Sequence, residues 1–445
     1  MTTTYDPTGT RTTTLSWSQR HRLLQTLEDA AHGTYNPHHS ILAVWATGTP
    51  DHQALHRAWI RLQQRHPVIL STIDPDTMRW TTGHVPPTPP TLLQAPEPRP
   101  PTTPENAVHA RAREAACLPF DLAGGPLARM IIAPASADRT LIVIALEHLI
   151  SDGWSRGLLL RDLSALYDEE TGNTPADLPA IGRTYSDLVA EQNTYLESDA
   201  GQTARRAVAS RVADIGAVPR LALPGFTPHP TRRPFAFGRL DRSLDADLYE
   251  RLQPVARASR LSRLNLVLAA LHAALEELTG HHEVATVMSV ANRAHPTRHH
   301  TLGWLAGEVI VRSRPQQLQT PIDYLRSLRA GIVDALTTAD VPWPTLIHDS
   351  DPAAYGKTTP IPHVAFVAES QRMSHAFEDR PAGGLRLTVV PMHTNRADQA
   401  LNTFWTEHAD SIHASFVYKT DWYSEPAISD LWNTCQTHLD HLANL

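Results

Sequence analysis

LIVIALEHLISDGWSRGLLLRDLSALY, from Leu141 to Tyr167, is the stretch of sequence that decides the fold. Its first six residues are apolar and rich in β-branched side chains, which is typical of a buried strand. The polar residues from Ser151 to Gly153 then favour a turn, and apolar residues recur from Leu159 at helical spacing. The stretch predicts a strand, a turn and a helix, with His148 at the end of the strand.

The two polar residues at the end of this strand, Glu147 and His148, are the first candidates for chemistry. Side chains alternate across a strand, so the two should point to opposite faces and only one of them should line a given channel. An imidazole has a pKa near the working pH, so it is able to accept a proton from an amine or alcohol, or to hold that nucleophile. We therefore expect His148 to act in catalysis, beside a turn that Asp152 and Gly153 suit.

Strands and helices alternate through the rest of the chain as well. Asp51 and Ser262 each precede a helical pattern, and aspartate and serine are residues that cap helix N-termini. The proline-rich stretch from Pro86 to Pro104 predicts an extended connection. The sequence therefore predicts an α/β (α+β) protein. The expected helices are 51–66, one from Pro104 and 262–280, and the expected strands are 41–47, 141–146 and 283–290.

The length of 445 residues exceeds the size at which one hydrophobic core usually stops growing, so two domains are expected. The segment ETGNTPADLPAIG, residues 170–182, carries glycine, asparagine and two prolines and is the candidate linker. We expect a first domain of residues 1–178, which carries EHLISDG, and a second of residues 179–445.

Composition and charge exclude several classes of protein. The net charge of -7 opposes nucleic-acid binding, which needs a concentrated basic surface. Cys117 and Cys435 form neither a disulfide framework nor a zinc motif. The N-terminus lacks the regions of a secretory signal, and no stretch approaches the ~18 apolar residues of a membrane span. We expect a cytoplasmic protein that binds neither nucleic acid nor membrane.

Paired histidines raise the question of a metal site. The chain has 25 histidines, and the pairs 38–39, 281–282 and 299–300 have no third ligand at a recognisable spacing. We therefore expect no metal.

The segment EHLISDGWS, from Glu147, resembles the HHxxxDG signature of the condensation domains of nonribosomal peptide synthetases. The second histidine, the aspartate and the glycine of that signature are present as His148, Asp152 and Gly153. Further segments resemble the other motifs of the family, in family order: LSWSQRHRLL from Leu15, RHPVILSTI from Arg65, PFDLAGGPLAR around Phe120, TYSDLVAEQNTYLES from Thr184, VANRAHPTRHHTLGWLAGEVIVRSR from Val290, DVPWPTLI from Asp340 and YKTDWYSEPAI from Tyr418. The chain is similar to a free-standing member of this family.

The resemblance implies two lobes, each like chloramphenicol acetyltransferase, arranged in a V around a central channel. It also implies an acyltransferase of nonribosomal peptide, antibiotic or related natural-product biosynthesis. Such an enzyme moves an acyl or aminoacyl group from the phosphopantetheine thioester of a carrier protein to an amine or a hydroxyl. The chain itself would bind no cofactor, would work as a monomer, and would receive its substrate from a carrier protein in trans.

Site residues follow from the resemblance, position by position. His148 would be the catalytic histidine, and the backbone of Gly153 would lie beside the thioester. Asp152 would be a structural residue held by Arg293 of VANR. Glu147 departs from the pattern, because it replaces the first histidine of the signature, and once buried it would need a basic or hydrogen-bonding partner. The other candidates for the substrate channel are Ser151, Trp154, Ser155 and Trp304.

Two other interpretations remain open. Residues 153–157 also satisfy G-x-S-x-G, the nucleophile elbow of serine hydrolases, with Ser155 as the nucleophile. The elbow serine should follow a strand directly, whereas here the strand ends near His148. Alternatively, the fold has lost catalysis and recruits a partner enzyme or carrier protein, which the replacement at Glu147 favours and the presence of His148 opposes.

Overall fold

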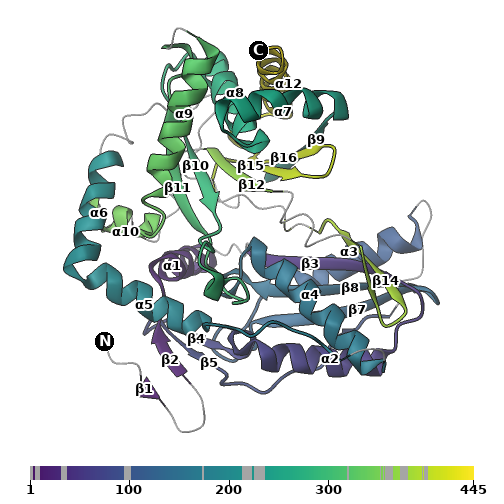
Figure 1. Ribbon diagram of the computed structural model, residues 1–445. Helices are drawn as coiled ribbons and strands as arrows, with labels where there is room; N and C mark the ends of the chain where they lie inside the picture. The colour runs from purple at the N-terminus through teal and green to yellow at the C-terminus, as the bar shows by residue number, and fades with distance from the viewer. Residues whose placement is uncertain are drawn as a thin grey trace.

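The computed structural model has two lobes, one above the other, each built around a six-stranded sheet (Figure 1). It describes residues 4–5, 11–31, 38–94, 102–172, 175–212, 223–224, 236–317, 320–350, 352–353, 355, 364–370, 379–392, 394 and 399–445. We call the lobe with the strand order β13-β14-β3-β8-β7-β6 the N-terminal lobe, and the lobe with the order β11-β10-β12-β15-β16-β9 the C-terminal lobe. Helices pack on both sheets, so the predicted α/β class is confirmed.

The N-terminal lobe contains most of the elements of the first half of the chain. The strands of its large sheet are β3 (His39–Thr47), β6 (Thr91–Leu92), β7 (Ala128–Ser136), β8 (Arg139–Glu147), β13 (Arg380–Ala382) and β14 (Leu385–Val390). A small sheet holds β1 (Thr4–Tyr5), β2 (Arg11–Thr14), β4 (Thr72–Asp74) and β5 (Arg79–Thr82). The helices are α1 (Trp17–Ala31), α2 (His52–Arg65), α3 (Pro104–Ala116) and α4 (Gly153–Glu170), with the short turns η1 (Pro67–Leu70) and η2 (His148–Ile150).

The predicted helices of this lobe form where their capping residues stand. The carboxylate of Asp51 accepts hydrogen bonds from the backbone N–H groups of Gln53 and Ala54 at the start of α2. Thr103 caps α3 in the same way, ahead of Pro104. The predicted strands 41–47 and 141–146 are confirmed within β3 and β8. The proline-rich stretch contains only the two-residue strand β6, and its residues 95–101 lie outside the described residues.

Both faces of the large N-terminal sheet are apolar and buried. On β8, Ile142, Ile144 and Leu146 belong to a core shared with α2 and α4. The alternate residues Leu141 and Val143 belong to a second core, which α3 covers. A strand that is buried on both faces has apolar residues at every position. For this reason apolar and polar residues do not alternate in LIVIAL.

The C-terminal lobe repeats the sheet-and-helix plan with other helices. Its strands are β9 (Phe237–Leu244), β10 (Val284–Val290), β11 (Gly307–Ser313), β12 (Val364–Glu369), β15 (Leu401–Glu407) and β16 (Ile412–Lys419). Its helices are α7 (Ala246–Ser259), α8 (Arg263–Thr279), α9 (Pro321–Leu336), α10 (Trp343–Ser350) and α12 (Glu425–Ala443), with the turns η4 (Pro296–Arg298) and η5 (Pro315–Gln317). Ser262 caps α8 and Gly280 ends it with φ 69°, so the predicted helix 262–280 is confirmed, as is strand 283–290 in β10.

Among the described residues, one face of this second sheet packs against a large apolar core. Phe366, Trp405 and Phe416 point to the side that α8 and α12 cover. The alternate residues of the same strands, such as Val367 and Phe404, point toward the N-terminal lobe. The space between the lobes is therefore bounded above by the face of this sheet that lies away from its apolar core.

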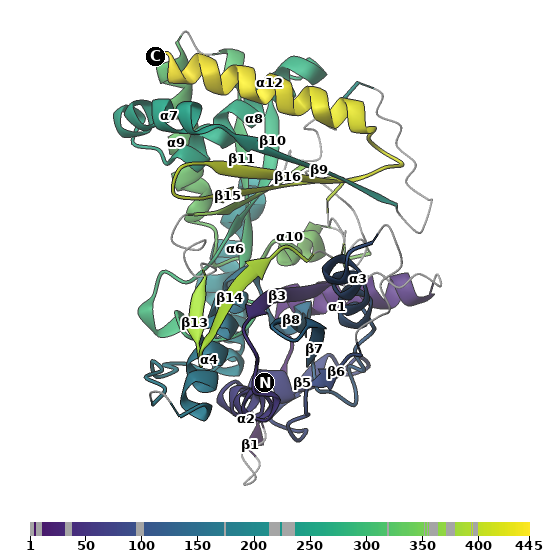
Figure 2. The ribbon, with the colours of Figure 1, turned by 90° about the vertical axis from the view of Figure 1, so that its right-hand side faces the viewer.

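The two halves of the chain are not separate in space. β13 and β14 come from the second half but extend the N-terminal sheet, where β14 pairs antiparallel with β3 (Figure 2). The helices α5 (Tyr185–Glu197) and α6 (Asp199–Val212) run up one side from the lower lobe to the upper (Figure 1). In the predicted linker, residues 175–182 have no helix or strand and residues 173–174 lie outside the described residues. The domain boundary between residues 178 and 179 stays a prediction.

Candidate functional site

A cavity of about 1370 Å³ lies between the two lobes, and residues of both lobes line it. Its lower part is bounded by α1, β3 and the first turn of α4, and its upper part by the face of the C-terminal sheet that lies away from the apolar core. His148 and Gly153 line this cavity, together with Trp304 from the loop before β11. Asp152 lines it as well, so the structure brings four of the sequence-predicted residues to one space.

A tightly held turn presents His148 to the cavity. β8 ends at Glu147, and residues 148–150 form the turn η2. The side chain of Gln19 donates a hydrogen bond of 2.7 Å to the carbonyl of Leu149, and the hydroxyl of Ser151 donates one of 3.1 Å to the carbonyl of Glu147. Leu149 is buried, so the backbone around the half-buried imidazole is fixed.

Two aromatic rings flank His148. The ring of Trp304 stands edge-on at 4.6 Å between centroids, and the ring of His38 does so at 6.4 Å. Arg22 of α1 donates a hydrogen bond of 2.8 Å to Nε2 of His38. His38 and Arg22 also line the cavity. In the sequence, His38 was a candidate only for metal binding, and Arg22 was not a candidate. Their position depends on how α1 and β3 pack beside β8, and no local pattern reports that packing.

Glu147 lies on the other face of the sheet and does not line the cavity. It is the direct partner of His39 in the register of β3 and β8, and its Oε2 lies 3.7 Å from Nε2 of His39. Burial raises the pKa of Glu147 to about 7, although nearby N–H groups, Arg22 and Arg129 act in the opposite direction. Burial likewise lowers the pKa of His39 to about 4. Glu147, which replaces the first histidine of the signature, therefore faces a basic side chain, His39, on the neighbouring strand.

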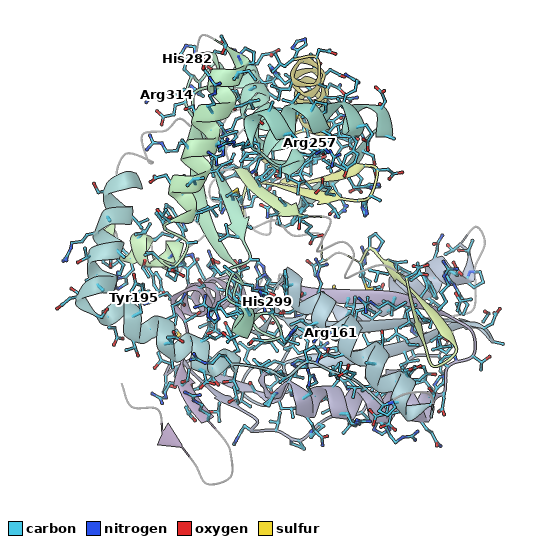
Figure 3. All side chains as sticks on the ribbon, in the orientation of Figure 1. Arg161, Tyr195, Arg257, His282, His299 and Arg314 are labelled. Atoms are coloured by element: carbon cyan, nitrogen blue, oxygen red, sulfur yellow. The ribbon has the colours of Figure 1, made fainter. Side chains whose placement is uncertain are left out.

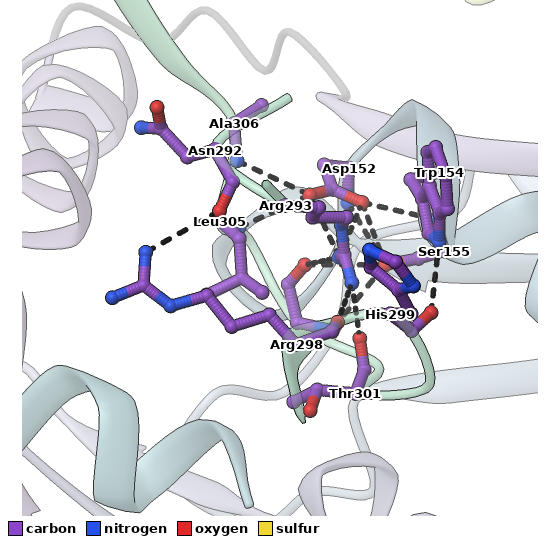
Figure 4. A network of polar contacts seen from close by, with 11 residues as sticks. Asp152, Trp154, Ser155, Asn292, Arg293, Arg298, His299, Thr301, Leu305 and Ala306 are labelled. Carbon is purple, nitrogen blue, oxygen red and sulfur yellow. Dashed lines mark hydrogen bonds and ion pairs between the residues drawn. The ribbon is translucent and has the colours of Figure 1, made fainter. Parts of the chain in front are cut away.

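A buried ion pair joins the turn after His148 to the loop after β10 (Figure 4). Nη2 of Arg293 lies 3.0 Å from Oδ2 of Asp152, and the same carboxylate accepts hydrogen bonds from the N–H groups of Leu305, Ala306 and Ser155. Burial alone would raise the pKa of Asp152, but Arg293 and the hydrogen bonds from Ser155 hold it below its usual value. The pair expected from the resemblance is present, and it fixes the loop that carries Trp304.

That loop also packs against α4. Nε1 of Trp154 donates a hydrogen bond of 3.0 Å to the carbonyl of His299 (Figure 4). His299 itself lies where the two lobes meet (Figure 3). Next to it, His300 is 3.0 Å from a guanidinium nitrogen of Arg161 on α4. The loop is therefore anchored along the first three turns of the helix.

The prediction that Ser151, Trp154 and Ser155 line the channel is wrong, because none of the three is among the residues that line the cavity. Ser151 and Ser155 are fully buried, and Trp154 points to the loop of His299. The hydroxyl of Ser155 is engaged by Asp152 Oδ1 and by the backbone of Gly303. Ser155 stands inside the first turn of α4 as part of a capping box, so it lacks the exposed position of an elbow nucleophile.

Alternate residues of the C-terminal sheet form the upper surface of the cavity, which we call the C-terminal wall. Its polar members include Asp241, Glu369, Asn402, Thr406, His413 and Ser415. Glu369 accepts a hydrogen bond of 3.0 Å from Arg156 of α4 and one of 3.2 Å from Thr406. A Cβ added to Gly153 would lie 3.7 Å from Arg156 and 3.8 Å from Glu369, so this pair lies directly beside Gly153.

Within the described ranges, no group of three or more histidine, cysteine, aspartate or glutamate residues is arranged to hold a metal ion. In the same part of the chain, no helix has the length and hydropathy that a membrane span needs.

Comparison with known families gives one match over nearly the whole chain. A family model described as "Condensation domain" matches residues 10–445. Phosphinothricin tripeptide synthetase PhsC of Streptomyces viridochromogenes is 29% identical over 312 residues, which cover 70% of this chain and 28% of the synthetase. Malpinin synthetase of Mortierella alpina is 26% identical over 309 residues, 69% of this chain and 4% of that synthetase. The chain thus spans less than a third of these relatives.

Solved structures agree on the fold. The X-domain in its complex with OxyB from teicoplanin biosynthesis superposes with a TM-score of 0.79 at 18% identity, over 100% of this chain and 95% of that one. SgcC5 of Streptomyces globisporus gives 0.77 at 17% identity, over 97% and 98%. These matches confirm the expected fold of two chloramphenicol acetyltransferase-like lobes.

Proposed function

The chain belongs to the condensation domain family, and from this premise we propose that it is an acyltransferase that moves an acyl or aminoacyl group from a carrier-protein thioester to an amine or a hydroxyl. The observation that carries the proposal is the position of His148. Its imidazole stands at the end of β8, inside a cavity that both lobes line. A nucleophile and an acyl thioester that enter this cavity would meet beside one titratable group.

The proposed reaction is direct transfer. The nitrogen or oxygen of the acceptor attacks the thioester carbonyl, a C–N or C–O bond forms, and the C–S bond breaks to release the carrier thiol. His148 holds the nucleophile and takes its proton, which then passes to the departing thiolate. The first turn of α4 begins at Gly153, and helix N-termini favour developing negative charge, so this backbone is suited to stabilise the oxyanion. Bringing the two reactants together supplies a large part of the rate.

The donor would come from a separate carrier protein, and the product would belong to a nonribosomal peptide or related natural product. Synthetases of that kind are the relatives in which this domain is one part of a much longer chain. The chain itself needs no bound cofactor in this mechanism, since the phosphopantetheine arrives with the carrier.

The test is transfer by the His148→Ala variant. The protein is incubated with an acyl-loaded carrier and a panel of amines and alcohols, and the products are followed by intact-mass analysis. Loss of the general base should reduce the rate by at least about a hundredfold. His295→Ala is the matched control, because His295 is exposed and does not line the cavity. Unchanged turnover by a folded His148→Ala variant contradicts the mechanism.

Recruitment of a partner protein is the second candidate. Glu147 replaces the first histidine of the signature, and one structural neighbour is described as an X-domain in complex with OxyB. Carrier binding without any product in the assay above would favour this function. The position of His148 in the cavity favours transfer, and the engaged hydroxyl of Ser155 gives no support to hydrolysis.

A further inference from the structure

The turn that carries His148 is held through its neighbour, Leu149. The side chain of Gln19, which is fully buried, donates to the carbonyl of Leu149 at 2.7 Å. On the other side, Oε1 of Glu147 accepts from the N–H of Leu149 at 3.5 Å. Both backbone groups of the residue after the catalytic imidazole therefore meet a side chain, and only one of these two side chains is ionisable.

Glu147 contacts this turn from behind the sheet. Its side chain is 13% exposed, and that of its cross-strand partner His39 is 0% exposed. His39 packs edge-on against Phe120 at 4.7 Å, and the guanidinium of Arg129 lies over the Phe120 ring at 3.9 Å. The carboxyl group is thus enclosed by β3, β7 and the segment after α3.

The tautomer of His39 decides which form of Glu147 fits. Nδ1 of His39 lies 2.8 Å from the carbonyl of Ala116, and a carbonyl only accepts, so Nδ1 carries the hydrogen. In the neutral ring, Nε2 then presents a lone pair toward Glu147. Oε2 of Glu147 lies 3.7 Å from Nε2, which is longer than a hydrogen bond, so a protonated Glu147 would donate to Nε2 once the two atoms approach, while its other oxygen accepts from Leu149. An ionised Glu147 would place two acceptors opposite one another.

The surrounding charges do not remove this preference. Arg22 of α1 and Arg129 of β7 favour the ionised carboxylate, and the imidazoles of His39 and His148 lie nearby. Burial outweighs these groups, and the pKa of Glu147 is raised to about 7. The change between the two forms of Glu147 therefore falls in the pH range where the protein is expected to work.

We propose that Glu147 is a positioning residue whose protonated form, hydrogen-bonded to His39, holds the turn of His148 in the productive position. Ionisation of Glu147 loosens the turn and slows transfer. The inference rests on the proposed acyl transfer, but the structural part is measurable without it. It also explains why a carboxyl group is tolerated where the signature carries histidine, since the imidazole partner stands on the opposite strand.

The kinetic test compares pH–rate profiles of the wild type and Glu147→Gln. The amide of glutamine donates to Nε2 of His39 and accepts from Leu149 at every pH, so it imitates the protonated acid. The ratio of the variant rate to the wild-type rate should be constant below pH 6 and should rise as the pH passes 7, by at most about tenfold per pH unit, the limit for a single ionisation that abolishes transfer. Because the ionisations of His148 and of the acceptor affect both rates equally, their effects cancel in the ratio.

Gln19→Leu is the matched control. It removes the other hydrogen bond to Leu149 without changing an ionisable group, so its rate relative to wild type should be lower and independent of pH. A ratio for Glu147→Gln that does not change between pH 6 and 8.5 overturns the proposal.

The second measurement does not depend on turnover. In the His148→Ala background, the amide resonance of Leu149 in protein labelled with ¹⁵N-leucine should titrate with a midpoint near 7. Glu147→Gln in the same background should abolish that titration. A Leu149 amide that does not titrate rules out the coupling even where transfer is observed. A titrating amide in a protein that transfers nothing supports the coupling and defeats the proposed function instead.

Discussion

The two large sheets of this protein are covered differently, although both have six strands. In the N-terminal sheet, neighbouring residues of β8 such as Leu141 and Ile142 are both buried, in separate cores on the two faces. In the C-terminal sheet, Phe366 of β12 is buried in a core whereas Val367 lines the cavity. One sheet is an internal layer of its lobe, and the other is a boundary of the site.

The difference matches what each lobe contributes. His148 follows a strand that is packed on both faces, and packing of that kind holds a catalytic group in one position. The C-terminal wall is an open sheet face, where side chains are free to change without loss of a core. The first lobe therefore fixes the chemistry, and the second presents the surface that a substrate would meet.

Truncation of adjacent residues gives the largest expected effect. Phe366→Ala should destabilise the protein by about 3–5 kcal/mol, because it leaves a cavity in the core. Val367→Ala should cost less than about 1 kcal/mol, because its side chain is half-buried on the wall. On β8, by contrast, Leu141→Ala and Ile142→Ala should each cost about 2–5 kcal/mol. Urea unfolding of the four variants measures the differences.

This prediction depends on the coverage of the sheets alone. Equal costs for Phe366→Ala and Val367→Ala would mean that the wall is covered by protein in solution. A small cost for either β8 variant would mean that one face of the N-terminal sheet is open, and the contrast between the lobes would be lost.

The second prediction concerns the pair Glu147 and His39, because burial disfavours the charged form of each side chain. Because the pKa of Glu147 is raised from 4.5 to about 7, the protonated group stabilises the folded state below pH 4.5, and this contribution is lost as the pH rises through 7. His39 behaves oppositely, since its pKa is lowered from 6.5 to about 4, and its contribution is lost as the pH falls below 6.5. Each amounts to up to about 3 kcal/mol before solvent screening.

In the wild type these two slopes nearly cancel between pH 4.5 and 6.5. Relative to wild type, Glu147→Gln should therefore gain stability as the pH rises through this range, and His39→Gln should lose it. Urea midpoints at half-unit steps of pH measure both. Parallel curves for the three proteins would show that this pair is hydrated, unlike the rest of the doubly covered sheet.

The sequence predicted most of what local patterns encode. α2 and α8 begin after the expected caps, and β8 and the turn of His148 lie where the apolar run ends. It did not predict that β14 joins the N-terminal sheet, because strand pairing at long range leaves no mark in either segment. Nor did it place Ser151 and Ser155, since the direction of a side chain in a turn depends on the packing around it.

The residues around His148 also could not be predicted from local sequence patterns. Arg22 and His38 reach the cavity only through the packing of α1 and β3 against β8. Glu369 meets Arg156 across 213 residues of sequence, and no motif links them. A signature identifies the group that reacts, whereas the side chains around it are brought together by tertiary structure.

The smallest expected effect belongs to that ion pair, which joins the wall to α4. Arg156 and Glu369 are 30% and 23% exposed, so water screens their attraction, and Glu369→Gln should change stability by less than about 1 kcal/mol. The buried pair Asp152–Arg293 connects the same helix turn to the same half of the chain with side chains 3% and 1% exposed. There, Arg293→Ala leaves a buried carboxylate without its partner and should cost about 3–5 kcal/mol. Urea midpoints at low and high salt separate the two pairs, since only the exposed pair should weaken with salt. If Glu369→Gln cost as much as Arg293→Ala, the wall would be part of a core, and the two sheets would be alike after all.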